Sequence, residues 1–118
     1  MLSLGHKNLD VWQQSKRLVV HIYKLTKNFP SHEMYTLISQ IRRAAISIPS
    51  NIAEGASRSN TKDRRRFYEI ARSSLVELDT QIEIAIDLDY CNADDIREIE
   101  KEINQLFGRL STLITKTK

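Results

Sequence analysis

The residues of this sequence best suited to chemistry are the arginines and lysines between positions 58 and 72. Spacings of three or four place several of them on one helical face, with only Asp63 and Glu69 among them. Guanidinium and ammonium groups neutralise phosphates, and such binding is salt-sensitive and largely indifferent to base sequence. We therefore expect a nucleic-acid-binding surface formed by Arg58, Lys62, Arg64, Arg65, Arg66 and Arg72, with Arg42 and Arg43 as outlying members. Tyr68 is a candidate for stacking on a base.

A second interpretation of the same charges is contact between copies of the chain. Residues 1–72 hold 13 basic and five acidic residues, whereas residues 73–102 hold two basic and ten acidic residues. This imbalance suits either a polyanionic partner or pairing between oppositely charged regions of neighbouring subunits. Apolar residues beside the predicted core stripes also favour association; they are Trp12, Val19, Tyr23, Phe107 and Ile114.

The sequence contains no combination of residues typical of a catalytic or metal site. Its three histidines lie in separate segments, and neither a Glu-x-x-His motif nor a glycine-rich phosphate loop occurs. Cys91 stands close to acidic residues, which should raise the pKa of its thiol and lower its reactivity. Glu83 and Asp87 share a helical face, but no third ligand is fixed beside them. We expect no enzyme activity, no metal and no cofactor.

Four amphipathic helices are predicted to position these residues. Apolar residues recur at spacings of three and four over residues 10–28, 32–57, 61–88 and 93–116. Helices joined by such short connections pack antiparallel to their neighbours. We expect a single domain over residues 1–118, folded as an all-α, up-down-up-down antiparallel four-helix bundle.

Polar residues before each apolar pattern predict where the helices begin. Asp10 is expected to cap the first helix, with Gln13 reaching back as in a capping box. Ser31, Asn60 and Asn92 are the expected caps of the second, third and fourth helices.

Pro49 interrupts the second predicted helix without changing its apolar phase. Proline lacks the N–H that would bond the Ala45 carbonyl, at a cost of roughly 3 kcal/mol or more. The sequence therefore predicts a kink in this helix at Pro49. Asn51 and Glu54 lie within two turns of the proline, and we expect them to satisfy freed backbone groups or to pair with an arginine such as Arg43.

Composition limits where the protein is expected to act. The chain of 118 residues has one cysteine, which excludes an internal disulfide, and no apolar run of membrane-spanning length. We expect a cytoplasmic protein that does not contact a membrane.

Three stretches of the sequence resemble a known family. They are Leu9-Asp10-Val11-Trp12-Gln13, the run from Gln40 to Gly55 that contains Ser-Ile-Pro-Ser-Asn-Ile-Ala-Glu-Gly, and Thr61-Lys62 followed by Phe67 to Gln81. They resemble the bacterial four-helix-bundle proteins encoded in intervening sequences of 23S ribosomal RNA genes. More distantly, they are similar to the accessory variability determinant proteins of diversity-generating retroelements.

The resemblance implies partners that the residue pattern does not. It implies a homo-oligomer, in particular a pentamer, and it favours RNA over DNA as the polyanion. The more distant similarity, to the accessory variability determinant proteins, implies a protein partner such as a reverse transcriptase. The leading prediction is thus a nucleic-acid-binding oligomer, and the alternative is a protein–protein scaffold or accessory subunit without direct nucleic-acid contact.

Overall fold

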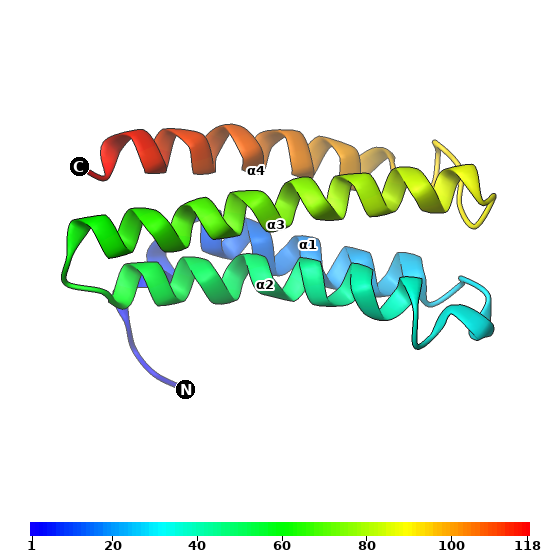
Figure 1. Ribbon diagram of the computed structural model, residues 1–118, viewed down its shortest axis with the longest axis horizontal. Coiled ribbons are helices and arrows are strands. Elements are labelled where there is room, and N and C mark those ends of the chain that lie inside the picture. The colour runs from blue at the N-terminus through cyan, green and yellow to red at the C-terminus, as the bar shows by residue number, and fades with distance from the viewer.

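The computed structural model describes residues 1–118 as four long α-helices with no strand. The helices are α1 (Asp10–Thr26), α2 (Leu37–Ser57), α3 (Thr61–Asp87) and α4 (Arg97–Lys116), with short 3-10 helices at Gly5–Asn8 (η1) and Ser31–Glu33 (η2). They lie side by side in a bundle of 44 × 27 × 20 Å, and each runs opposite to the one before it (Figure 1). The all-α four-helix fold predicted from the sequence is confirmed.

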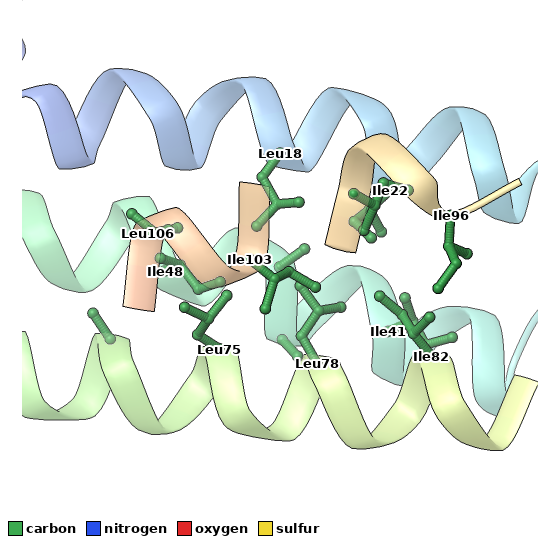
Figure 2. Close-up of a cluster of buried hydrophobic side chains, with 14 of the residues drawn as sticks. Leu18, Ile22, Ile41, Ile48, Leu75, Leu78, Ile82, Ile96, Ile103 and Leu106 are labelled. Atoms are coloured by element: carbon green, nitrogen blue, oxygen red, sulfur yellow. The ribbon is translucent and has the colours of Figure 1, made fainter. Parts of the chain in front are cut away.

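One apolar stripe from each helix meets along the bundle axis. Figure 2 shows the central part of this core, where side chains from all four helices interdigitate. Burying each large aliphatic side chain contributes about 1.5–3 kcal/mol, so the core is the main source of stability. The fully buried members include Leu18, Ile22, Ile41, Ile48, Leu75, Leu78, Leu106 and Leu110.

Helices α2 and α4 begin later than the predicted residues 32 and 93, and the predicted caps Ser31 and Asn92 do not cap them. Ser31 opens η2, whose N-terminus has no side-chain cap. Asn92 instead exchanges two hydrogen bonds with Asp95, and this closed turn precedes α4. Because both segments form turns of their own, the α-helices start at Leu37 and Arg97.

The two remaining cap predictions have opposite outcomes. The side chain of Asn60 accepts a hydrogen bond from the Asp63 backbone N–H at 3.1 Å, which confirms it as the cap of α3. Asp10 is wrong as a cap, because Leu9 occupies that position without a side-chain hydrogen bond. Gln13 donates to the Lys7 carbonyl at 2.9 Å and so holds η1 against α1.

Polar side chains surround Pro49 inside α2, which is assigned as one helix through the proline. The amide of Asn51 donates to the Ser47 carbonyl at 2.8 Å and to the Ser47 hydroxyl at 2.9 Å. That hydroxyl lies 2.9 Å from the Ser74 hydroxyl and links α2 to α3. Glu54 pairs with Arg58 and not with Arg43. The kink itself stays a prediction.

Helices α2 and α3 approach each other closely at Gly55. A Cβ atom there would lie 2.8 Å from Cε1 of Tyr68 and 3.0 Å from the Arg64 carbonyl oxygen. Only glycine therefore allows this contact, which fixes the first turns of α3 against the end of α2. None of the helices is both long enough and apolar enough to cross a bilayer.

Candidate nucleic-acid interface

The bundle topology gathers basic residues at one end of the molecule. The start of α1, the connection from α2 to α3 and the end of α4 lie together there (Figure 1). We call this the basic end; its members are Lys7, Arg58, Lys62, Arg64, Arg65, Arg66, Lys116 and Lys118. The opposite end carries the turn from α3 to α4, with Asp87, Asp89, Asp94, Asp95 and Glu98. The uneven charge along the sequence becomes an uneven charge along the bundle axis.

Two of the predicted residues at the basic end are free for a ligand. Lys62 and Arg66 are exposed in the first turns of α3, and neither forms an ion pair. They stand one helical turn apart on the same helix, so both charges face solvent from neighbouring positions.

Three other predicted arginines hold the structure together. Arg58 pairs with Glu54 at 3.1 Å and lies over the Phe67 ring. Arg65 donates through Nε to the Thr117 carbonyl at 3.0 Å. Arg72 donates to the Ser111 hydroxyl at 3.1 Å, so α3 contacts α4 through two guanidinium groups.

The structure does not bring Arg42 and Arg43 to the basic end. Both lie in the first half of α2, which starts at the opposite end of the bundle. Arg42 donates to the Thr26 hydroxyl at 2.9 Å and its guanidinium lies 4.4 Å from the centre of the Tyr23 ring. Arg43 is exposed. Tyr68 is wrong as a base-stacking residue, because only 1% of it is accessible.

Arg64 differs from the other arginines because it faces inward. It is half-buried on the first turn of α3, and its Nε is buried without a hydrogen-bond acceptor. No carboxylate pairs with it. The side chain borders a cavity of about 440 Å³ at the basic end.

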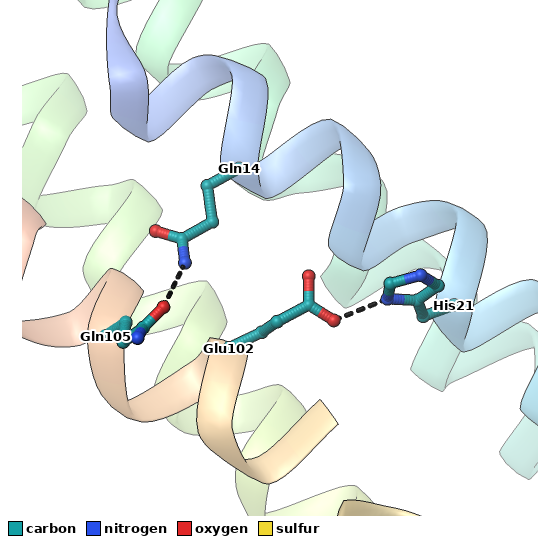
Figure 3. Close-up of polar contacts among 4 residues, drawn as sticks. All are labelled: Gln14, His21, Glu102 and Gln105. Atoms are coloured by element: carbon teal, nitrogen blue, oxygen red, sulfur yellow. Dashed lines mark hydrogen bonds and ion pairs between the residues drawn. The ribbon is translucent and has the colours of Figure 1, made fainter. Parts of the chain in front are cut away.

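A polar layer between α1 and α4 was missed by sequence reasoning. Gln14 is 3% exposed, yet its amide donates to Gln105 at 3.1 Å and accepts from Arg109 at 3.0 Å. His21 contacts the Glu102 carboxylate in the same layer (Figure 3). Helical spacing within one segment could not reveal these pairs, because the partners lie on different helices.

At the end of the bundle opposite to the basic end, hydrogen bonds shift the pKa values of two side chains, Glu33 and Tyr90. The carboxylate of Glu33 accepts from the Thr36 hydroxyl and, at 2.7 Å, from the Tyr90 hydroxyl, which lowers the pKa of Glu33. The same bond to Glu33 raises the pKa of Tyr90. Burial raises the pKa of the Cys91 thiol, and the negative charge of Asp95 raises it further by a smaller amount. No three His, Cys, Asp or Glu side chains converge as ligands for a metal ion.

Comparisons with known proteins agree with this architecture. A solved structure from Bacteroides thetaiotaomicron, described as a protein of unknown function from the S23 ribosomal protein family, superposes with a TM-score of 0.82. It is 22% identical, and the match covers 90% of this chain and 96% of that one, so it shows a shared fold. The search of curated proteins gives no match. The model of the 23S rRNA-intervening sequence protein family matches residues 7–112, and the chain therefore belongs to that family.

Proposed function

We propose that the protein is a non-enzymatic, cytoplasmic homo-oligomer that binds RNA through the basic end. The observation that carries this proposal is the pair Lys62 and Arg66, which are exposed, free of ion pairs and surrounded by further basic residues. Cationic side chains on such a surface neutralise phosphates and release the counterions condensed on the nucleic acid, and the contacts read no base sequence. RNA is favoured over DNA because the family is that of proteins encoded in ribosomal RNA genes.

Oligomerisation would multiply these weak contacts. Along its outward face α3 carries Ile70, Val76, Ile84 and Leu88, each between 37% and 51% exposed. Another subunit can cover these apolar side chains, while Lys62 and Arg66 in the first turns of α3 stay free for RNA. We propose that this face contacts another subunit, and a pentamer is the assembly that the family resemblance implies. Several basic ends in one particle bind one RNA with avidity.

The test is RNA binding by a charge-reversed variant. Replacing Lys62 and Arg66 with Glu should weaken binding of a labelled RNA at least about tenfold near 0.1 M salt and flatten the dependence on salt. The matched control replaces two exposed residues near the opposite end with Glu, namely Lys24 of α1 and Lys27 directly after it. It makes the same change in net charge and should keep most of the affinity.

Three results would contradict the RNA proposal. They are no binding by the unaltered protein even at low salt, equal losses in the two variants, and binding that does not change with salt. Duplex DNA of equal charge is the second ligand, and tighter binding of DNA would contradict the preference for RNA.

A second candidate function is that of a protein scaffold or accessory subunit, with a reverse transcriptase as one such partner. The exposed apolar face of α3 favours this function, because such a face can bind another protein in the absence of nucleic acid. If the Lys62 and Arg66 variant loses its oligomeric state while RNA never binds, the basic residues serve subunit contacts and this second function is preferred.

A further inference from the structure

The cavity beside Arg64 has the features of a ligand site. It lies at the basic end, between the N-terminal segment, the last turn of α2, the first turns of α3 and the end of α4, and its volume of about 440 Å³ is in the range typical of small-ligand sites. Leu4, Leu9 and Leu113 form apolar walls, while Arg64 and His6 supply polar groups. The residues come from four separate segments, so the folded bundle assembles the site.

Arg64 supplies the argument that an anion belongs in this cavity. Its Nε–H is buried and has no acceptor, and leaving such a donor unpaired is costly. Arg58, Arg65 and Arg72 all have partners, so Arg64 is unusual among the arginines that contact the bundle. A guanidinium group presents donors in a planar fork that matches a phosphate or carboxylate.

Two neighbours hold the position of these polar groups. The backbone of Arg64 is fixed by the close contact between Gly55 and α3, where the Arg64 carbonyl limits the space. The His6 ring packs edge-on against Trp12, with ring centres 5.0 Å apart. A ligand in the cavity can meet the terminal nitrogens of Arg64, which form no hydrogen bond, and a small movement of the side chain would also bring its buried Nε to an acceptor.

We propose that this cavity binds the terminal nucleotide of an RNA that carries a phosphate monoester at its end. The terminal phosphate would accept from Arg64 and His6, and the apolar walls would cover the sugar and base. This inference rests on the proposed RNA binding and adds a preference for phosphorylated ends. A terminal phosphate monoester carries up to one more negative charge and one more free oxygen than an internal phosphodiester, so a guanidinium group should favour the end of the RNA.

The experiment compares short RNAs of one sequence with different ends. The RNAs carry a 5′-phosphate, a 3′-phosphate or hydroxyls at both ends, and the hydroxyl RNA is lengthened by two nucleotides to keep the total charge similar. A phosphorylated RNA should bind the unaltered protein at least about tenfold tighter than the hydroxyl RNA. Whichever phosphorylated end is preferred identifies the end that enters. Equal affinity for all three would overturn the inference while leaving the proposed RNA binding intact.

Matched variants assign the preference to the cavity. Arg64→Gln should remove the preference but retain binding of the hydroxyl RNA, because Lys62 and Arg66 are unchanged. Arg66→Gln removes the same charge from the exposed surface. It should weaken the binding of all three RNAs equally and keep the preference for the phosphorylated end. A preference that survives in Arg64→Gln would overturn the inference. If Arg64→Gln does not fold, His6→Ala on the N-terminal segment takes its place with the same expectation.

A direct measurement separates this site from the RNA proposal. Adenosine 5′-monophosphate and adenosine are titrated separately while the Arg64 Nε–H resonance is followed by NMR. The monophosphate should shift this resonance and adenosine should not. A shift in a protein that fails to bind any RNA would support the cavity as a phosphate site, but it would contradict the proposed function and RNA as the ligand of the cavity. No shift with the monophosphate would overturn the cavity as a phosphate site.

Discussion

Gly55 is the residue on which the contact between α2 and α3 depends. A methyl group there would overlap the Tyr68 ring and approach the Phe67 Cβ at 3.0 Å. Tyr68 is fully packed and the Arg64 carbonyl is backbone, so neither can move freely. The conformation at Gly55 is ordinary helix, and the requirement is for space alone.

Gly55→Ala should therefore lower the free energy of unfolding by about 1–3 kcal/mol, the usual cost of overpacking. Gly108→Ala on α4 is the matched control, because nothing lies within 4 Å of the added Cβ. It should raise the free energy by roughly 0.5–1 kcal/mol through helix propensity. Urea unfolding measures both, and a neutral Gly55→Ala would show that α3 can shift away.

The bond from Tyr90 to Glu33 predicts a pH dependence of stability. The pKa of Glu33 is lowered from its usual value of 4.5, so its contribution is present above pH 4.5 and is lost as pH falls through the folded-state pKa. The pKa of Tyr90 is raised from 10.0, so its contribution is present below that pH and is lost as pH rises through the folded-state value.

Tyr90→Phe removes the donor of this bond and keeps the ring that packs against Phe29. The loss in melting temperature relative to the unaltered protein should be largest near pH 7 and should shrink well below pH 4.5. A loss of equal size at neutral and acid pH would assign the effect to packing instead of to the hydrogen bond.

At the scale of the helices, Pro49 lies within a turn of α2 that a hydrogen bond from the Asn51 side chain spans. Proline removes one helical hydrogen bond, and the Asn51 amide donates to the Ser47 carbonyl on the preceding turn. The carbonyl that the proline leaves free is that of Ala45, so the Asn51 side chain does not replace the lost bond but ties together residues 47 and 51, which flank the proline.

A double-mutant cycle tests whether this tie reinforces the helix around the proline. Asn51→Ala should cost about 1 kcal/mol of unfolding free energy alone. In the Pro49→Ala background, where the backbone N–H is restored, the cost should fall by at least about 0.5 kcal/mol. Pro49→Ala alone should stabilise by up to roughly 3 kcal/mol. Strict additivity in chemical unfolding would mean that Asn51 acts independently of the proline.

Helix number and core faces could be predicted from sequence because each helix buries one stripe of regular spacing. The starts of α2 and α4 could not, because the turns before them depend on contacts such as the bond from Tyr90 to Glu33. The same limit applies to the candidate site. Spacing placed the arginines on one helix, but the partner of Arg65 is Thr117 at the far end of the sequence. Which cations remain free is a property of the packed helices.

At the scale of the whole molecule, the exposed face of α3 predicts an assembly. If another copy covers it, the mass in solution should be about five times the chain mass of 13.7 kDa, as the family resemblance implies. Ile84→Lys should reduce the particle toward single chains while leaving the helical content unchanged, because Ile84 is outside the core. Thr112→Lys, an exposed position on α4, is the control. Light scattering measures the masses, and a monomeric unaltered protein would contradict the oligomer.

The three-residue connection from α2 to α3 also has a consequence for the order in which the chain folds. Only residues 58–60 separate the two helices, so bringing them together costs little loop-closure entropy. Gly55, Ser47 and Ser74 then supply specific contacts between them without help from the rest of the chain. The α2–α3 hairpin is therefore the expected nucleus, with α1 and α4 docking onto it after the rate-limiting step.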